Sequence, residues 1–293
     1  MIERLDLERL DRDLFRGHSP NDGRPRVFGG QVAAQALVAA MRTVSPALAG
    51  DGASAAARHA HSLHAYFLRP GDPSRPILYA VDRIRDGRSF TTRTVKAIQE
   101  GEAIFQMTAS FQVLEGGLEH HWPMPEAPPP ESVPSVSELI RRAAEESGDP
   151  IYRFLDRLER PIVVHDLDPV DPRRPHARKG PHMVWFRADG ELSDDPLLHQ
   201  CVLTYASDYT LLDASLHVHG KTWFDPRIVA ASLDHAIWFH RPFRADRWLL
   251  YVTESTSTSE ARGMNLGRIY TQDGLLVASV AQESLMRVVD KKH

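Results

Sequence analysis

The sequence contains little that would indicate a disulfide-rich, nucleic-acid-binding or membrane-spanning protein. A single cysteine, Cys201, rules out an intramolecular disulfide framework and suits a reducing compartment. The formal net charge is only -4, which gives no electrostatic case for binding nucleic acid or an anionic membrane. No run approaches the roughly eighteen apolar residues of a membrane-spanning helix. We therefore expect no nucleic acid partner and no membrane span.

Targeting signals are missing from the two ends of this sequence. Residues 1–6 are charged and lack the apolar run of a secretory signal. Residues 290–293 do not match the Ser-Lys-Leu type of peroxisomal address. The composition, with 42% hydrophobic and 25% charged residues, is that of a globular protein. These observations predict a cytoplasmic location.

Common catalytic and metal-binding signatures are also missing. The sequence has no Gly-x-Ser-x-Gly elbow, no glycine-rich phosphate loop and no cysteine pair at metal-ligand spacing. Histidines gather at His59, His61 and His64, but no further ligand lies in register with them. We therefore predict no metal and no cofactor.

The first part of the chain predicts one helix followed by an antiparallel sheet. Residues 32–41 are small and apolar with high helix propensity, which is typical of a buried helix. Residues 45–58, rich in Ala, Gly and Ser, predict a flexible insertion. Beyond them the hydrophobic period changes to two, and turns separate four predicted strands, at 61–68, 77–84, 89–99 and 103–113. The turns favour an antiparallel meander, so this part is predicted to be an α+β unit.

The second part of the chain repeats the first. Arg69-Pro70 is matched by Arg241-Pro242, an offset of 172 residues (241 minus 69). In the same register, residues 77–79 (Ile-Leu-Tyr) are matched by residues 249–251 (Leu-Leu-Tyr). Two tandem units, each a long helix plus an antiparallel sheet, are therefore predicted. Their boundaries are placed at residues 1–116 and 160–293, with a proline-rich linker carrying short helices at 117–159.

Asp208 is the leading catalytic candidate. Residues 198–212 carry apolar side chains at helical spacing, which predicts a largely buried helix around this acid. An Asp inside such a helix costs helix propensity and desolvation free energy. The structural alternative is an Asp satisfied by backbone donors. The repeat favours a site, because an Asp needed for the fold should occur in both copies and the first helix has no acid.

Two further polar residues are confined to the second copy. Ser232 corresponds to Ala60 at the offset of 172, and Gln282 corresponds to Ala109 with a slip of one residue. A carboxylate, a hydroxyl and a carboxamide could together hold and deprotonate one water molecule. We therefore predict that Ser232 and Gln282 act with Asp208.

Gly29 and Gly30 stand at the start of the first predicted helix. Two glycines there leave backbone N–H groups accessible to an acceptor, although close helix packing alone would explain them equally well. The third glycine and the lysine of a nucleotide-binding loop are missing. Cys201 falls on the apolar face of the second helix and is predicted to be inert core packing.

Several segments resemble the acyl-CoA thioesterase II family, whose members have a double hotdog fold. The resemblance covers nearly the whole chain and is carried by residues 27–31 (Val-Phe-Gly-Gly-Gln), 61–72, 205–208 (Tyr-Ala-Ser-Asp), 233–243 and 270–274. It implies a pair of hotdogs, each a long helix wrapped by a curved sheet, that hydrolyses fatty acyl-CoA to free acid and CoA. The catalytic Asp, Thr or Ser, and Gln of similar proteins fall on Asp208, Ser232 and Gln282.

Chemistry and resemblance together predict that Asp208 acts as general base toward a water molecule. An Asp nucleophile stays open as an alternative. Backbone N–H groups at a helix N-terminus, which Gly29 and Gly30 would provide, are the expected oxyanion donors. Arg262 is a candidate for contacting CoA phosphates, or else forms a salt bridge of the fold. Similar proteins form dimers or tetramers, so we expect a homodimer or homotetramer.

Two other functions are alternatives to thioester hydrolysis. A hotdog hydratase acting on enoyl-CoA would be expected to show an Asp-x-Asn-x-x-His pattern, but Asp208 is followed by Tyr-Thr-Leu-Leu-Asp. A non-catalytic acyl-CoA-binding or scaffold protein is the hypothesis from another class. Release of free thiol from acyl-CoA separates the three.

Overall fold

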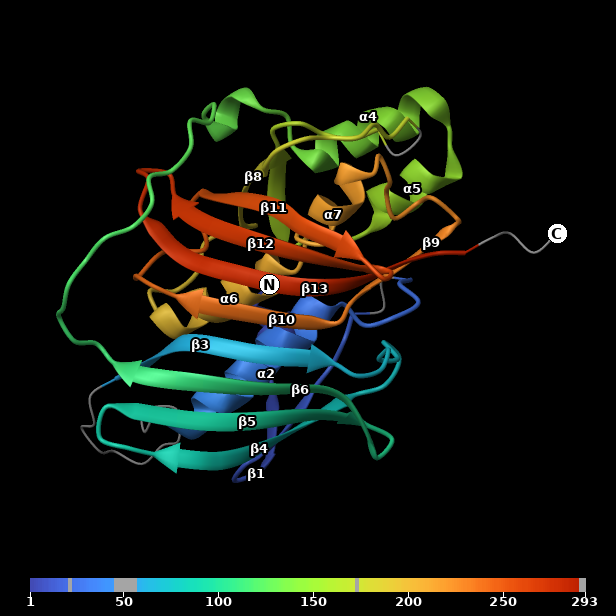
Figure 1. The fold of residues 1–293 in the computed structure, drawn as a ribbon. Coiled ribbons are helices and arrows are strands. Elements are labelled where there is room, and N and C mark those ends of the chain that lie inside the picture. The colour runs from blue at the N-terminus through green and yellow to red at the C-terminus, as the bar shows by residue number, and fades with distance from the viewer. Residues whose placement is uncertain (21–22, 45–56, 172–173, 290–293) are drawn as a thin grey trace.

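One antiparallel sheet of 13 strands curves around two central helices (Figure 1). The computed structural model describes residues 1–20, 23–44, 57–171 and 174–289. Its first half contains α1 (Ile2–Leu5), β1 (Glu8–Asp11), β2 (Leu14–Gly17), α2 (Gly29–Val44), β3 (Arg58–Phe67), β4 (Ile77–Asp86), β5 (Phe90–Gln99) and β6 (Glu102–Val113). Residues 45–56, most of the predicted insertion, lie outside the described residues.

The second half begins with a segment that connects the strands of the first half to those of the second. This segment holds η1 (Pro130–Ser132), α4 (Val136–Ser147) and α5 (Pro150–Arg157). The remaining elements are β7 (Ile162–Asp166), β8 (His182–Ala188), α6 (Pro196–Ser207), α7 (Asp213–Val218), β9 (Ile228–Ser232), β10 (Asp234–Phe239), β11 (Leu249–Ser259), β12 (Arg262–Thr271) and β13 (Leu276–Val288). The boundaries at residues 116 and 159 fall between β6 and β7 and stay a prediction.

The strand order confirms the α+β class and the two tandem units. It runs β1-β2-β4-β5-β6-β3-β10-β13-β12-β11-β8-β7, with β9 also paired to β13. The order β4-β5-β6-β3 in the first half is therefore mirrored by β11-β12-β13-β10 in the second. In the first half α2 packs against β4, β5 and β6, and in the second half α6 packs against α2 while α7 packs against β11.

The predicted meander of four strands is wrong for β3. This strand pairs with β6 on one side and with β10 on the other, and it has no pairing with β4. The connection from β3 to β4 crosses the ends of the other strands instead of forming a hairpin. The arrangement leaves β3 without a free edge, and the two halves share one sheet across the β3–β10 pair (Figure 1).

A local two-fold axis relates the two halves. Along the antiparallel β3–β10 pair, His64 lies opposite Ala236, and these residues are separated by the repeat offset of 172 (236 minus 64). Tyr66 and Ser62 lie opposite Asp234 and Trp238, at equal steps on either side of that pair. Residues that are 172 positions apart in the sequence are therefore related by this two-fold axis.

Both copies interrupt the same strand at the same place. In β3 the register with β6 shifts between Ala60 and Ser62, which leaves His61 as the extra residue of a bulge. In the second copy the chain leaves the ladder at Leu233, between β9 and β10, and position 233 is the repeat equivalent of 61 (233 minus 172). A bulge bends a strand and redirects the neighbouring side chains, here Ala60 in one copy and Ser232 in the other.

No helix in the described part of the chain is long and apolar enough to cross a membrane. The longest, α2, spans 16 residues and is almost wholly buried between the sheet and α6.

Candidate active site

Asp208 stands directly after α6 and not inside a helix. The helix ends at Ser207, Asp208 is its C-cap residue with φ of -86° and ψ of -2°, and α7 starts only at Asp213. The prediction of a helix through residue 212 is therefore wrong. Leu211 and Leu212 are buried in the intervening turn, so the apolar pattern continues beyond the helix.

Asp208, Ser232 and Gln282 form a continuous row of hydrogen bonds. The Ser232 hydroxyl lies 3.1 Å from Asp208 Oδ1 and donates to it. The Gln282 amide Nε2 donates to Ser232 Oγ at 2.9 Å. The three side chains come from different elements, the C-terminal end of α6, the end of β9 and the middle of β13. The structure thus brings together the three residues that the sequence comparison of the two copies selected.

The strand registers confirm the two repeat matches behind that selection. Ser232 lies opposite Ser284, and Ala60 lies opposite Phe111 in the first copy. In the later strands the repeat offset is 173 residues, so Ser284 corresponds to Phe111 (284 minus 173). Because their cross-strand neighbours correspond, Ser232 and Ala60 are equivalent positions. Gln282 and Ala109 are equivalent by the same argument, because their cross-strand neighbours are Asn265 and Arg93 (265 minus 172).

The first turn of α2 comes from the other half of the molecule and meets Asp208. The Gly30 backbone N–H donates a hydrogen bond to the Asp208 carboxylate. A Cβ atom at Gly29 would lie 2.8 Å from Asp208 Oδ2, and one at Gly30 would lie 2.5 Å from the carbonyl oxygen of Tyr205. Glycine is therefore required at both positions for close packing, and Gly30 also serves as a donor. The site draws on both repeats.

Burial raises the pKa of Asp208 to about 7. Hydrogen bonds from Ser232, the Gly30 backbone and Gln282 favour the ionised form and act in the opposite direction, but desolvation outweighs them. The carboxyl group can therefore gain and lose a proton near neutral pH, which is what a general base or acid needs.

The sequence comparison missed His235, which is fully buried next to the three residues. Its Nδ1 lies 2.6 Å from Gln282 Oε1, and its Nε2 lies 2.8 Å from Ser207 Oγ. A signal was present, because the repeat equivalent of position 235 is Leu63 (235 minus 172), another polar residue in place of an apolar one. His59, His61 and His64, to which the sequence draws attention, lie in β3, in the first copy.

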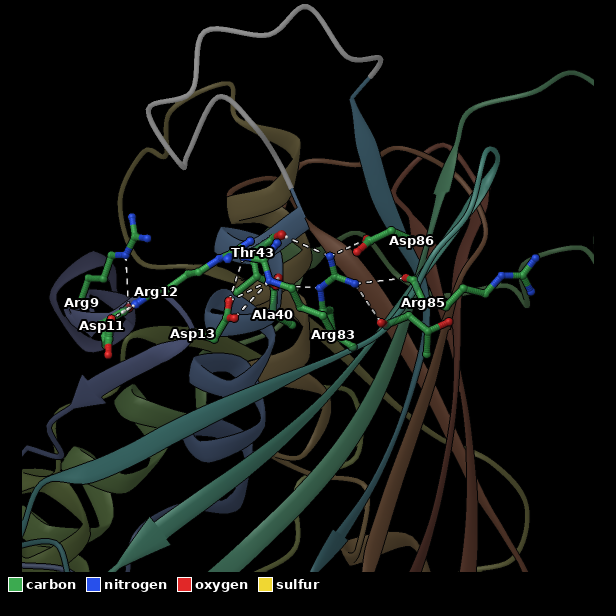
Figure 2. Close-up of polar contacts among 11 residues, drawn as sticks. Arg9, Asp11, Arg12, Asp13, Ala40, Thr43, Arg83, Arg85 and Asp86 are labelled. Carbon is green, nitrogen blue, oxygen red and sulfur yellow. Dashed lines mark hydrogen bonds and ion pairs between the residues drawn. The ribbon is translucent and has the colours of Figure 1, made fainter.

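In the first copy, the position that corresponds to Asn265, the cross-strand neighbour of Gln282, holds an arginine. Arg93, which corresponds to Asn265, is 1% exposed and donates to Thr43 Oγ1 at 2.9 Å. It also forms an ion pair of 2.6 Å with Asp86. Figure 2 labels Thr43, on α2, and Asp86, at the end of β4, and its dashed lines mark the polar contacts among the residues drawn. With Ala60 and Ala109 beside it, this position holds a structural ion pair and no counterpart of the Asp208 row.

Arg262 lies on the opposite face of the sheet from Gln282. Along β12 the inward positions are those of Gly263 and Asn265, so the side chain of Arg262 points outward. There it forms an ion pair of 2.9 Å with Glu283, the outward neighbour of Gln282 on β13. This placement fits the salt bridge of the fold, and a contact of Arg262 with CoA stays a prediction.

Cys201 takes no part in this arrangement. Cys201 is buried on α6, and burial raises the pKa of its thiol well above the usual value, so it packs as an inert side chain. Among the described residues, no group of three or more His, Cys, Asp or Glu side chains is arranged to hold a metal ion.

Comparison with known protein families gives two matches along the chain. Residues 162–285 match the family described as acyl-CoA thioesterase, and residues 18–112 match the acyl-CoA thioesterase N-terminal domain. Among curated proteins, Acyl-CoA thioesterase 2 of Haemophilus influenzae is 39% identical over 98% of this chain and 96% of its own length. Acyl-coenzyme A thioesterase 8 of Homo sapiens is 40% identical over 97% of this chain and 88% of its own.

Solved structures agree with these matches. The acyl-CoA thioesterase II TesB2 from Mycobacterium marinum is 41% identical, covers 99% of both chains and superposes with a TM-score of 0.75. A protein with a hotdog fold from Alicyclobacillus acidocaldarius is 19% identical, with a TM-score of 0.73 over 98% of both chains, which shows likeness of fold alone. The predicted double hotdog is thereby confirmed.

Proposed function

This chain belongs to the acyl-CoA thioesterase family and is a thioester hydrolase. On that premise we propose that it hydrolyses fatty acyl-CoA to free fatty acid and CoA by attack of water assisted by Asp208. The observation that carries the proposal is the row of hydrogen bonds from Gln282 through Ser232 to Asp208. Such a row fixes the carboxylate and leaves its remaining lone pairs available to accept a proton from water.

The roles follow from what each group can donate or accept. Asp208 is the group in this row that can take a full proton near neutral pH, so it acts as the general base. Ser232 and Gln282 hold the carboxylate and the water in line with the thioester carbonyl. General-base assistance of this kind contributes about 10² to 10⁴ in rate.

The oxyanion donor is proposed to be the Gly29 N–H. Gly29 is the first residue of α2, where N–H groups have no acceptor within the helix, and its Cα lies against Asp208. The Gly30 N–H already donates to Asp208 and is less available to a substrate. A positioned donor of this type is worth roughly 3 to 4 kcal/mol in other hydrolases.

Thiol release tests the function directly. We expect the protein to release free CoA from a long-chain acyl-CoA, detected with a thiol reagent, whereas acyl-CoA without the protein should release none over the same time. The alternative of an enoyl-CoA hydratase predicts loss of the double bond of an enoyl-CoA without thiol release. Absence of thiol release across a series of chain lengths would overturn the proposal.

The pH profile tests the role of Asp208. Because burial raises the pKa of this carboxyl to about 7, kcat/KM should increase as pH rises through about 7 and level off above it. The buried His235 has its pKa lowered to about 4 by desolvation, so it stays neutral over that range and adds no second step. A profile that is flat between pH 5 and pH 9 would contradict Asp208 as the base. The control is stability over the same range, measured by thermal denaturation.

A further inference from the structure

His235 joins the two parts of the site that otherwise belong to separate elements. Its imidazole contacts Gln282 Oε1 at 2.6 Å on β13 and Ser207 Oγ at 2.8 Å on α6. Ser207 immediately precedes Asp208, and its carbonyl oxygen accepts a hydrogen bond of 2.9 Å from the Tyr251 hydroxyl. One side chain with no solvent exposure therefore ties the residue before the acid to the amide that completes the row.

We propose that His235 is a positioning residue for thioester hydrolysis, which holds the Gln282 amide in the one orientation that lets Ser232 donate to Asp208. This inference rests on the proposed function.

The direction of the hydrogen bonds follows from the acid. An ionised carboxylate only accepts, so the Ser232 proton goes to Asp208 Oδ1. Ser232 Oγ must then accept from Gln282, which places Nε2 toward Ser232 and Oε1 toward His235. Because Oε1 also only accepts, His235 Nδ1 carries the proton.

The other ring nitrogen completes the assignment. Burial lowers the pKa of His235 to about 4, so the ring is neutral at pH 7 and holds a single proton. With that proton on Nδ1, the Nε2 atom can only accept, so the Ser207 hydroxyl, which also lies 3.0 Å from the Thr204 carbonyl oxygen, directs its proton to Nε2 at 2.8 Å. The chain of donors runs from Ser207 through His235, Gln282 and Ser232 to Asp208.

A flipped Gln282 amide would break this chain. Its Oε1 would face Ser232 and accept the hydroxyl proton that Asp208 needs, while its NH₂ group would face the Nδ1–H of His235 donor to donor. Both ends of the flipped amide would therefore be unfavourable. The first copy has Leu63 at the equivalent of position 235. A leucine at position 235 could not distinguish the two orientations of the Gln282 amide.

Two isosteric substitutions separate the contacts of the ring. In His235→Asn the side-chain nitrogen can occupy the place of Nδ1 and still donate to Gln282, whereas in His235→Gln it reaches toward Ser207 instead. We expect His235→Gln and His235→Leu to lower kcat by about 30-fold with little change in KM. His235→Asn should recover most of that loss. The matched control is His240→Gln, an exposed histidine just beyond the same strand that contacts Ser279.

A double-variant cycle tests whether His235 acts through Gln282. In a Gln282→Leu background there is no amide to orient, so His235→Gln should lower kcat by less than about twofold more. Losses that multiply, or a His235→Asn variant as slow as His235→Leu, would overturn the inference. If the wild-type protein releases no thiol, the proposed function fails and the inference with it. If Asp208→Asn is inactive but all His235 variants match the wild type, the inference alone fails.

The tautomer can be read in the wild-type protein without any loss of folding. The ¹⁵N resonances of the His235 imidazole, assigned by their absence from the spectrum of His235→Asn, should show a protonated Nδ1 and an unprotonated Nε2 at pH 7. The opposite tautomer would reverse the Gln282 amide and overturn the inference even if His235→Gln or His235→Leu fails to fold.

Discussion

The substitution Asp208→Asn should lower kcat on a long-chain acyl-CoA by about 10³-fold or more. Asn has nearly the same shape, and its amide oxygen can still accept from Ser232, so the surrounding packing should be kept. What it loses is the ability to take a proton from water, and general-base assistance accounts for about 10² to 10⁴ in rate. Turnover is measured by thiol release.

The route of the reaction can be separated from the loss of rate. If Asp208 acts as a base, a single turnover in ¹⁸O-water places the label in the fatty acid and leaves the carboxylate unlabelled. If Asp208 attacks the thioester itself, the label appears in Asp208 through an anhydride. Retention of most of the wild-type kcat by Asp208→Asn would rule out both routes.

The same variant should be more stable than the wild type at alkaline pH. A carboxyl whose pKa is raised in the folded protein stabilises the fold below its unfolded pKa of about 4, and this contribution is lost as pH rises through about 7. The amide of Asn carries no charge to desolvate. We expect the free energy of unfolding at pH 8 to increase by on the order of 2 kcal/mol, allowing for the solvent contact that Asp208 keeps. At pH 4 the difference should nearly vanish.

The substitution Gly29→Ala should lower kcat by about 10²-fold. The added methyl group would lie 2.8 Å from Asp208 Oδ2 and 2.8 Å from the ring of Phe67, so either the carboxylate or the start of α2 must move. A displacement of about 1 Å in a catalytic group can cost that much in rate. The chain offers a matched control, because an added Cβ at Gly117 meets nothing within 4 Å.

The pH profile of Gly29→Ala identifies the cause of its loss. If the carboxylate moves away from the Gly30 N–H, the pKa of Asp208 should rise further, and the midpoint of the kcat/KM profile should move to higher pH. Thermal denaturation of both alanine variants separates this effect from loss of fold. Equal kcat values for Gly29→Ala and Gly117→Ala would show that the close approach at Gly29 has no part in turnover.

Local patterns in the sequence were enough for most helices and strands, but not for their pairing. The alternation of apolar residues found β4, β5 and β6, and tight turns joined them correctly. The Pro70-Gly71 turn after β3 suggested another hairpin, yet β3 pairs with β6 and β10. Turn residues report that a chain changes direction, whereas the strand that it meets next depends on long-range packing.

The three polar residues of the site could be predicted because the chain contains its own reference copy. Asp208 was placed in a helix, however, since Leu211 and Leu212 continue the apolar pattern and no glycine or proline marks the end of α6 at Ser207. His235 differs from its repeat equivalent Leu63 in the same way, so the pattern that marks the three residues marks His235 as well. Gly29 and Gly30 were recognised as accessible, but their partner across the molecule could not be read from neighbouring residues.

The shared sheet across β3 and β10 also bears on how such a chain can change over time. Two identical units paired in this way would each lend a glycine turn to the other and form two equal sites. Once both units lie in one polypeptide, their sequences can diverge, and one site suffices for turnover. The position of the site that is no longer needed can then be selected for stability alone. In this chain that position holds Arg93 and its ion pair with Asp86. The first half of this molecule therefore contributes the start of α2 to a site whose polar side chains all come from the second half.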